Sequence, residues 1–283
     1  MKVRIFTPVV AAALLGLLPV APAAARTTAT RIELPPSEVT ALARLDHSPR
    51  HGEWDNVKMA DGTLIRTWVS YPQRSTKAPV VLVIHEIFGL SDWVRSVADQ
   101  LAAEGYIAVA PDLISGMGPH GGGSDSVDRD GAVKLVSSLP RAEVDARLDA
   151  VRAWALALPS ADGHIGEIGF CWGGTSSFWY ASHQPGLDAA VVYYGTAPTE
   201  TAQLEAIKAP VIGFYGGKDE RVGATVPATE SAMKTLGKPY EANMEAGAGH
   251  GFLRAQELMN GANLRAAEDA WPKTIAFFRK YLK

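Results

Sequence analysis

A run of eight residues, Ala78 to His85, sets the first limit on the fold of this chain. It reads Ala-Pro-Val-Val-Leu-Val-Ile-His and is nearly all apolar or β-branched. Such a strand is buried on both faces, as strands inside a parallel sheet are. Because parallel strands need crossover connections, usually helices, the surrounding segments should alternate between strand and helix.

The rest of the chain shows this alternation, with no composition break and no internal repeat. Asp61-Gly62 separates two β-like runs, 54–59 and 63–71, and therefore predicts a hairpin. The pattern predicts one α/β domain over 51–283, with a mainly parallel sheet and helices on both faces. Periodicity predicts helices over 92–104, 143–158, 175–182 and 266–282, and further strands over 106–110, 164–170, 189–194, 210–215 and 240–244.

The first 25 residues are interpreted as an export signal. Lys2 and Arg4 precede an apolar run, Phe6 to Val20, and three alanines end at Ala25. This is the order of a signal peptide, and the run of about 15 residues is shorter than the roughly 20 of a spanning helix. We predict cleavage near Ala25 and a periplasmic or secreted protein without stable membrane association. Residues 26–50 show weak periodicity and are predicted to be a loosely structured lead-in.

Charge and cysteine content narrow the function classes. The chain has 27 basic and 30 acidic residues, a net charge of −3, and loss of residues 1–25 with Lys2 and Arg4 would make it −5. This balance gives no electrostatic case for nucleic acid. The single cysteine, Cys171, excludes an intramolecular disulfide and a cysteine-rich zinc site. The histidines show no metal-ligand spacing, so no metal and no cofactor is predicted.

The most informative segment is Gly169-Phe170-Cys171-Trp172-Gly173-Gly174. It joins a predicted strand to a predicted helix, which is the nucleophile-elbow pattern with cysteine in place of serine. Glycine at 169 and 173 lets the strand and helix backbones approach each other. The turn places the Trp172 N–H at a helix start, where it can donate to an oxyanion. For the motif alone, a buried structural cysteine is the alternative.

Two downstream residues supply the groups that such a nucleophile needs. Asp219 follows the predicted strand over 210–215, and His250 lies in a glycine-rich loop before the last helix. The order nucleophile, acid, base is that of α/β-hydrolase triads. His250 would take the thiol proton, and Asp219 would hold the imidazole in the useful tautomer. A helix cap at Asp219 and a structural loop histidine at His250 are the alternatives.

A fourth segment, His85-Glu86-Ile87-Phe88-Gly89, directly follows the first buried strand. Its position predicts that the Ile87 N–H is the second oxyanion donor. Glu86 in this place is unusual, because a carboxylate repels a thiolate. A glutamate on a surface loop is the alternative.

Together these segments resemble the dienelactone hydrolases, which are cysteine members of the α/β-hydrolase fold. The resemblance implies that Cys171, Asp219 and His250 form the triad, and that Glu86 takes the thiol proton when substrate binds. It further implies that Arg254 pairs with Glu86 and with a substrate carboxylate. The matching segments are H-E-I-F-G at 85–89, P-D-L at 111–113, G-F-C-W-G-G at 169–174, Y-Y-G at 193–195, G-G-K-D at 216–219 and G-H-G-F-L-R at 249–254.

One element of that family has no counterpart here. Its second substrate-binding arginine would lie in the segment after 111–113, which is a glycine-rich loop in this chain. Arg129 and Arg141 lie beyond this loop, and neither is assigned the role. The loop, 114–125, is expected to be either a lid over the site or a passive surface loop.

The sequence thus predicts an exported cysteine hydrolase that cleaves a small ester or lactone through an acyl-thioester. Arg254 would favour a substrate with a carboxylate, and Tyr193 and Tyr194 would line the pocket. One alternative is a general carboxylesterase or thioesterase. Another is a non-catalytic binding or redox-sensing protein that uses Cys171 as a switch. The expected partner is the small-molecule substrate alone, with a monomer as the expected oligomeric state.

Overall fold

The computed structural model describes residues 1, 3–5 and 32–283. Nearly all of the predicted signal peptide therefore lies outside the described residues. Residues 32–283 form one compact unit. Within the described part of the chain, no helix has the length and apolar character needed to cross a membrane.

The core of this unit is an eight-stranded sheet in the order β1-β2-β4-β3-β5-β6-β7-β8. Strands β1 and β2 form the antiparallel edge, and the strands from β3 to β8 pair in parallel. This confirms the predicted α/β fold. The strands are β1 (Gly52–Lys58), β2 (Leu64–Ser70), β3 (Ala78–Ile84), β4 (Ile107–Pro111), β5 (Ala161–Phe170), β6 (Ala189–Tyr193), β7 (Val211–Gly216) and β8 (Tyr240–Glu245).

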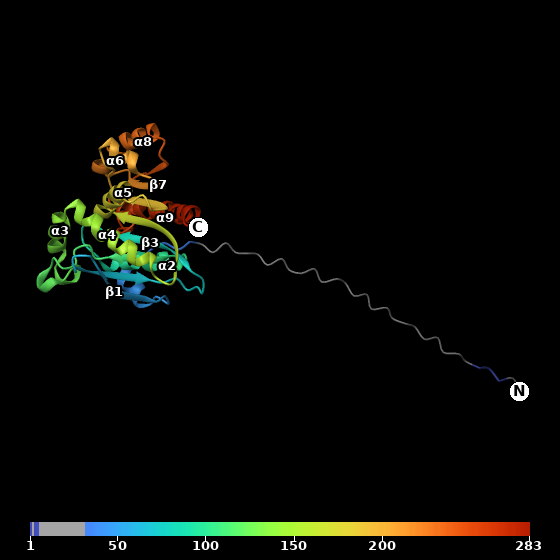
Figure 1. Ribbon diagram of the computed structural model, residues 1–283. Helices are drawn as coiled ribbons and strands as arrows, with labels where there is room; N and C mark the ends of the chain where they lie inside the picture. The colour runs from blue at the N-terminus through green and yellow to red at the C-terminus, as the bar shows by residue number, and fades with distance from the viewer. Residues whose placement is uncertain (2, 6–31) are drawn as a thin grey trace. The chain divides into compact units, whose positions relative to one another are not determined.

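Helices cover both faces of the sheet, as Figure 1 shows. Helix α1 precedes the first strand, and the other helices connect strands or follow the last one. The helices are α1 (Ala41–Asp46), α2 (Asp92–Ala103), α3 (Arg129–Ser138), α4 (Arg141–Leu156), α5 (Trp172–His183), α6 (Thr201–Ala206), α7 (Glu220–Gly223), α8 (Val226–Thr235) and α9 (Ala262–Tyr281), with short 3-10 segments at Pro119–Gly121, Ser124–Ser126 and Met259–Gly261.

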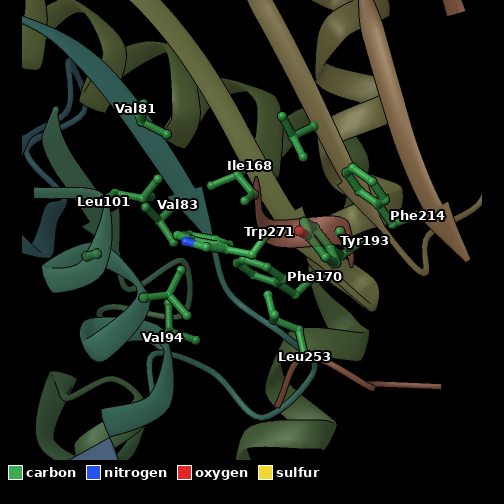
Figure 2. Close-up of a cluster of buried hydrophobic side chains, with 14 of the residues drawn as sticks. Val81, Val83, Val94, Leu101, Ile168, Phe170, Tyr193, Phe214, Leu253 and Trp271 are labelled. Carbon is green, nitrogen blue, oxygen red and sulfur yellow. The ribbon is translucent and has the colours of Figure 1, made fainter. Parts of the chain in front are cut away.

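Strand β3 shows why the sheet needs both helical layers. All seven of its residues are buried. Val81 and Val83 point into one core, which they share with α2 and α9 and which Figure 2 shows in part. Leu82 and Ile84 point into a second core with α4, α5 and α8. Side chains at alternate positions of one strand are thus buried on opposite faces of the sheet. This burial is the main source of stability.

The N-terminal segment is more ordered than the sequence predicted. Residues 32–50 contain α1, and Ala41 of that helix is fully buried in the core shared with α2. Helices α3 and α8 were also not predicted. Helix α3 begins at a side-chain cap, in which Asp128 accepts a hydrogen bond from the Gly131 N–H at 2.8 Å. It buries only Ala132 and Val136, too few apolar positions to give a helical period.

The parallel strands bring the candidate residues to one edge of the sheet. Loops after the carboxyl ends of β3, β5, β6, β7 and β8 carry Glu86, Cys171, Tyr194, Asp219 and His250 in turn. The strands pair in register over this edge. Ligand sites of open α/β sheets lie outside the carboxyl ends of the strands, so this edge is where a site is expected.

Candidate active site

Cys171 stands at a strained turn between β5 and α5. Its backbone has φ 56° and ψ −114°, outside the regions that residues with a side chain prefer. Its N–H donates to the Tyr193 carbonyl at 3.0 Å. A β-carbon on Gly169 would lie 2.0 Å from the Gly173 carbonyl oxygen, so only glycine permits this approach of strand and helix. The local sequence therefore builds the predicted elbow around the thiol.

Two backbone N–H groups face the thiol of Cys171. Burial raises the pKa of this thiol, and the charge of Glu86 raises it further, whereas backbone hydrogen bonds from Trp172 and Ile87 lower it. A group that lowers a thiol pKa stabilises the thiolate, so these two backbone groups act as N–H donors. The pair predicted as oxyanion donors thus comes together from separate loops, one after β3 and one after β5.

His85 holds the loop that carries Ile87. A carbonyl only accepts, so the His85 Nδ1–H donates to the Glu86 carbonyl at 2.7 Å, and Nε2 accepts from the Leu113 N–H at 3.2 Å. The ring stacks on Trp172 with centroids 5.5 Å apart and an interplanar angle of 14°. The neutral ring, whose pKa is lowered by burial, thereby connects the two oxyanion loops.

Asp219 and His250 meet across the ends of β7 and β8. His250 Nδ1 lies 2.5 Å from Asp219 Oδ2, and the carboxylate side chain is only 7% exposed. The Lys218 N–H donates to the Ala248 carbonyl at 2.8 Å and ties the two loops together. Because Nδ1–H faces the carboxylate, Nε2 is left to exchange a proton. Asp219 also caps α7 through the Val222 N–H at 3.3 Å, so the alternative interpretation of this residue as a helix cap is confirmed beside its contact with His250.

Glu86 is buried beside Arg254. Its side chain is 3% exposed, and Oε2 lies 2.6 Å from Arg254 Nε. The Arg254 Nε–H has no aligned acceptor among the described residues, so this contact is an ion pair rather than a directed hydrogen bond. Burial raises the pKa of Glu86 to about 7, with Arg254 opposing the rise. The carboxyl can therefore gain or lose a proton near neutral pH.

Two charged residues join this group that the sequence did not assign to it. Glu38, from the N-terminal segment, contacts Arg254, and Arg129, at the start of α3, contacts Glu38. Arg141 lies elsewhere, on α4, near Asp145. Sequence reasoning missed Glu38 because the preceding residues carry no motif. The one signal in the sequence was that Glu38 lies shortly before the predicted α/β domain.

The two predicted pocket tyrosines are both fully buried, and they make different contacts. Tyr193 is fully buried, and its hydroxyl pairs with Thr274 of α9 at 2.7 Å. The ring of Tyr194 lies edge-on to His250, with centroids 5.1 Å apart. Burial raises the pKa of Tyr194, and the charges of Glu86, Arg254 and Cys171 act on its hydroxyl. The Tyr194 hydroxyl has no hydrogen-bond partner among the residues with described structure. Unlike the Tyr193 hydroxyl, it is therefore free to donate to a ligand.

The glycine-rich loop after β4 is fastened at its base. Asp112 accepts hydrogen bonds from both the N–H and the hydroxyl of Ser124, each at 2.7 Å. The Gly118 N–H donates to the Gly122 carbonyl at 2.9 Å and closes the loop on itself. The Leu90 N–H donates to the Ser124 hydroxyl at 2.9 Å, which joins this loop to the one after β3. The loop is thus tied to the site's own scaffold.

Comparisons with known proteins identify the family. The model of the dienelactone hydrolase family matches residues 65–282. A protein of Methylorubrum extorquens named "Putative carboxymethylenebutenolidase" is 32% identical over 237 residues, covering 80% of this chain and 79% of that protein. Its namesake in Salmonella typhimurium is 31% identical over 278 residues, covering 92% and 95%. The crystal structure titled putative dienelactone hydrolase from Klebsiella pneumoniae is 31% identical, with a TM-score of 0.72, covering 82% of this chain and 99% of that one.

Proposed function

The chain belongs to the dienelactone hydrolase family, a family of hydrolases, and from this we propose that it is an exported cysteine hydrolase of small esters or lactones. The observation that carries the proposal is the strained turn at Cys171, which holds the thiol at the end of β5, on the same sheet edge as the Asp219–His250 pair. The Trp172 and Ile87 N–H groups, whose hydrogen bonds lower the thiol pKa, lie where they would stabilise the negative oxygen that develops when the sulfur attacks a carbonyl. The same arrangement has no evident use in a merely structural cysteine.

The first half of the reaction forms an acyl-thioester. The Cys171 thiol gives its proton to His250 Nε2, and its sulfur bonds to the substrate carbonyl carbon. Trp172 and Ile87 hold the resulting oxyanion. The tetrahedral intermediate then breaks its bond to the alkoxy oxygen, which leaves as an alcohol after it takes a proton from His250 Nε2. In a lactone, this alcohol stays attached to the acyl group.

The second half releases the acid. A water molecule gives a proton to His250 Nε2, and its oxygen attacks the thioester carbonyl. Asp219 keeps the imidazole oriented through the 2.5 Å contact and stabilises the imidazolium that forms. The carbon–sulfur bond breaks, and the sulfur recovers its proton. The products are a carboxylic acid and the free thiol, so no cofactor is consumed.

Glu86 has a supporting role in this proposal. Its ionised form raises the pKa of the thiol, so the resting enzyme keeps Cys171 protonated and slow to oxidise, which suits an oxidising compartment. A carboxyl with a pKa of about 7 is also matched to accept the thiol proton in place of His250 when substrate arrives, and that proton then goes to the leaving alkoxy oxygen. This agrees with the role that the family resemblance implies.

Arg254 supports a carboxylate-bearing substrate. It lies beside Glu86 with its side chain 17% exposed, so part of the guanidinium can meet a ligand. A guanidinium recognises a carboxylate through paired charge-assisted hydrogen bonds. A general carboxylesterase is the second candidate, and one observation favours it: Arg254 already contacts two carboxylates of this chain, those of Glu86 and Glu38.

Hydrolysis of two substrates by the purified protein tests the proposal. We expect turnover of a small chromogenic ester or of an unsaturated lactone with a free carboxylate, and loss of turnover in Cys171→Ala. Mass spectrometry of the acid-quenched reaction should show an acyl group on Cys171. A protein that hydrolyses neither substrate, while its thiol oxidises and recovers reversibly, would be a redox-sensing protein and would refute the proposal.

Export is tested separately. The full chain, produced in a Gram-negative host, should reach the periplasm or the medium with its N-terminus near Arg26, as read by N-terminal sequencing. Leu14→Arg places a charge in the apolar run and should retain the uncleaved chain in the cytoplasm. An intact N-terminus on wild-type protein in the cytoplasm would contradict the proposed localisation.

A further inference from the structure

The carboxylate of Glu38 bridges two arginines next to the nucleophile. Its Oε2 accepts a hydrogen bond from Arg254 Nη1 at 2.5 Å, and its Oε1 accepts one from Arg129 Nη1 at 2.9 Å. The two guanidinium groups also share the ring of Phe88, whose centroid lies 3.5 Å from Arg129 Cζ and 5.3 Å from Arg254 Cζ. One carboxylate with a cation on each oxygen is the arrangement in which arginines bind an anionic ligand.

Backbone contacts fix Glu38 in this place. The Glu38 N–H donates to the Arg254 carbonyl at 2.9 Å. Two residues earlier, the Pro36 carbonyl accepts from Trp93 Nε1 at 3.1 Å, and the Pro35 carbonyl accepts from Gln256 Nε2 at 2.9 Å. The segment is thus anchored to α2 and to the loop after His250. The segment that carries the Glu38 carboxylate is therefore held in place by hydrogen bonds to the rest of the domain.

A single residue, Glu86, links the Glu38–Arg254 ion pair to the Cys171 sulfur. Arg254 contacts Glu86 at 2.6 Å, and Glu86 acts on the Cys171 thiol. The two arginines and the two carboxylates, Glu86 and Glu38, balance in charge when all are ionised. A substrate carboxylate would add a third anion to this balanced group. It gains an arginine only if Glu38 leaves, and the Glu38 side chain, 37% exposed, can leave toward solvent.

We propose that Glu38 is a specificity-determining residue: an internal carboxylate that occupies Arg254 and Arg129 and competes with the carboxylate of an anionic substrate. Neutral esters and lactones do not need these arginines and escape the competition. Glu38 thereby lowers the preference for anionic substrates that the two arginines would otherwise create. This inference rests on the proposed hydrolase function and deepens it by naming what sets the charge preference.

The test compares two p-nitrophenyl esters of equal chain length, one neutral and one with a terminal carboxylate. The measured quantity is the ratio of kcat/KM for the anionic ester to that for the neutral ester. In Glu38→Gln we expect the ratio to rise about tenfold, mainly through a lower KM for the anionic ester. Effects on the chemistry that both esters share cancel in this ratio.

Two further variants make the outcome specific. Arg129→Gln removes one donor of the pair and should lower the ratio, even if Glu38→Gln does not fold. Glu33→Gln changes a carboxylate of the same segment that pairs with Arg44, outside the site, and should leave the ratio at the wild-type value. Competition with succinate gives an independent readout, since Glu38→Gln should bind it more tightly than wild type does when the neutral ester is the substrate.

The failures of the two proposals are distinct. If the wild type hydrolyses neither ester, the proposed hydrolase function fails. If Cys171-dependent hydrolysis is present but the ratio and the succinate inhibition are unchanged in Glu38→Gln, the specificity role of Glu38 is overturned and the hydrolase function stands. An equal loss toward both esters in Glu38→Gln would make Glu38 a structural residue only, which also overturns the role.

Discussion

A β-carbon on Gly173 would lie 2.3 Å from the carbonyl oxygen of Ile84. The start of α5 and the end of β3 therefore meet backbone to backbone, with no side chain between them. Trp172 precedes this contact in one segment, and Ile87 follows it in the other. The spacing of the Trp172 and Ile87 N–H groups is thus set by a position that only glycine can occupy.

Gly173→Ala should separate these donors. The added methyl group meets backbone oxygens that cannot rotate away, so we expect a loss of about 2–4 kcal/mol in the free energy of unfolding and a large fall in kcat. Urea unfolding followed by tryptophan fluorescence measures the first, and ester hydrolysis the second. Gly223→Ala is the control, because its β-carbon would meet only the Met244 methyl at 3.6 Å. Equal stability of Gly173→Ala and wild type would contradict the backbone contact.

Asp219→Asn should reduce catalysis while the fold persists. Asparagine caps a helix as well as aspartate does, so the bond to the Val222 N–H is kept. The charge that holds the His250 tautomer is lost, and kcat should fall by about 10²–10⁴. Asp128→Asn, at the cap of α3, is the matched control and should retain full activity. A drop in melting temperature large enough to account for the lost activity would argue against a catalytic role.

Glu86→Gln should make the thiol more reactive and the enzyme slower. The ionised carboxylate raises the pKa of Cys171, and it is ionised mainly above pH 7, since its own pKa is about 7. Iodoacetamide should therefore alkylate the variant faster than wild type above that pH, by about tenfold for each unit by which the thiol pKa falls. Below it the two rates should converge. Glu53→Gln, on β1, serves as the control, and an unchanged pH profile of alkylation in Glu86→Gln would refute the charge effect.

Glu167→Gln should stabilise the protein at high pH. Glu167 is fully buried in β5, and neither carboxylate oxygen has a hydrogen-bond partner among residues 32–283. Burial raises its pKa well above the ordinary glutamate value of 4.5 in the folded state. The folded protein thus holds a proton that the unfolded chain releases near that ordinary value, so stability falls as pH rises from there toward the folded pKa.

The amide removes this dependence. We expect Glu167→Gln to exceed wild type by about 1 kcal/mol or more at about pH 8 and to approach it as pH falls toward the ordinary glutamate pKa. Urea titrations across this range measure the difference. Glu205→Gln, on α6, is the exposed-carboxylate control. A gap between Glu167→Gln and wild type that is the same at every pH would count against a protonated buried carboxyl.

The sequence predicted those parts of the site that local rules determine. Glycines beside Cys171 have a steric reason that is readable along the chain, and Asp219 and His250 each follow a predicted strand. Glu38 and Arg129 obey no such rule. Glu38 lies 216 positions from Arg254 and 91 positions from Arg129. Only the folded chain brings these residues together. The sequence around Glu38 does not indicate which cationic side chain it will contact.

The bridge from Glu38 to Arg254 also bears on synthesis. Its two ends lie 216 positions apart, so nearly the whole domain must leave the ribosome before it can close. His250 emerges in that same late stretch. A growing chain therefore contains Cys171 long before it contains His250 and Arg254. Contacts between residues so far apart in the sequence slow folding. The site can form only after the C-terminal part of the chain has been made.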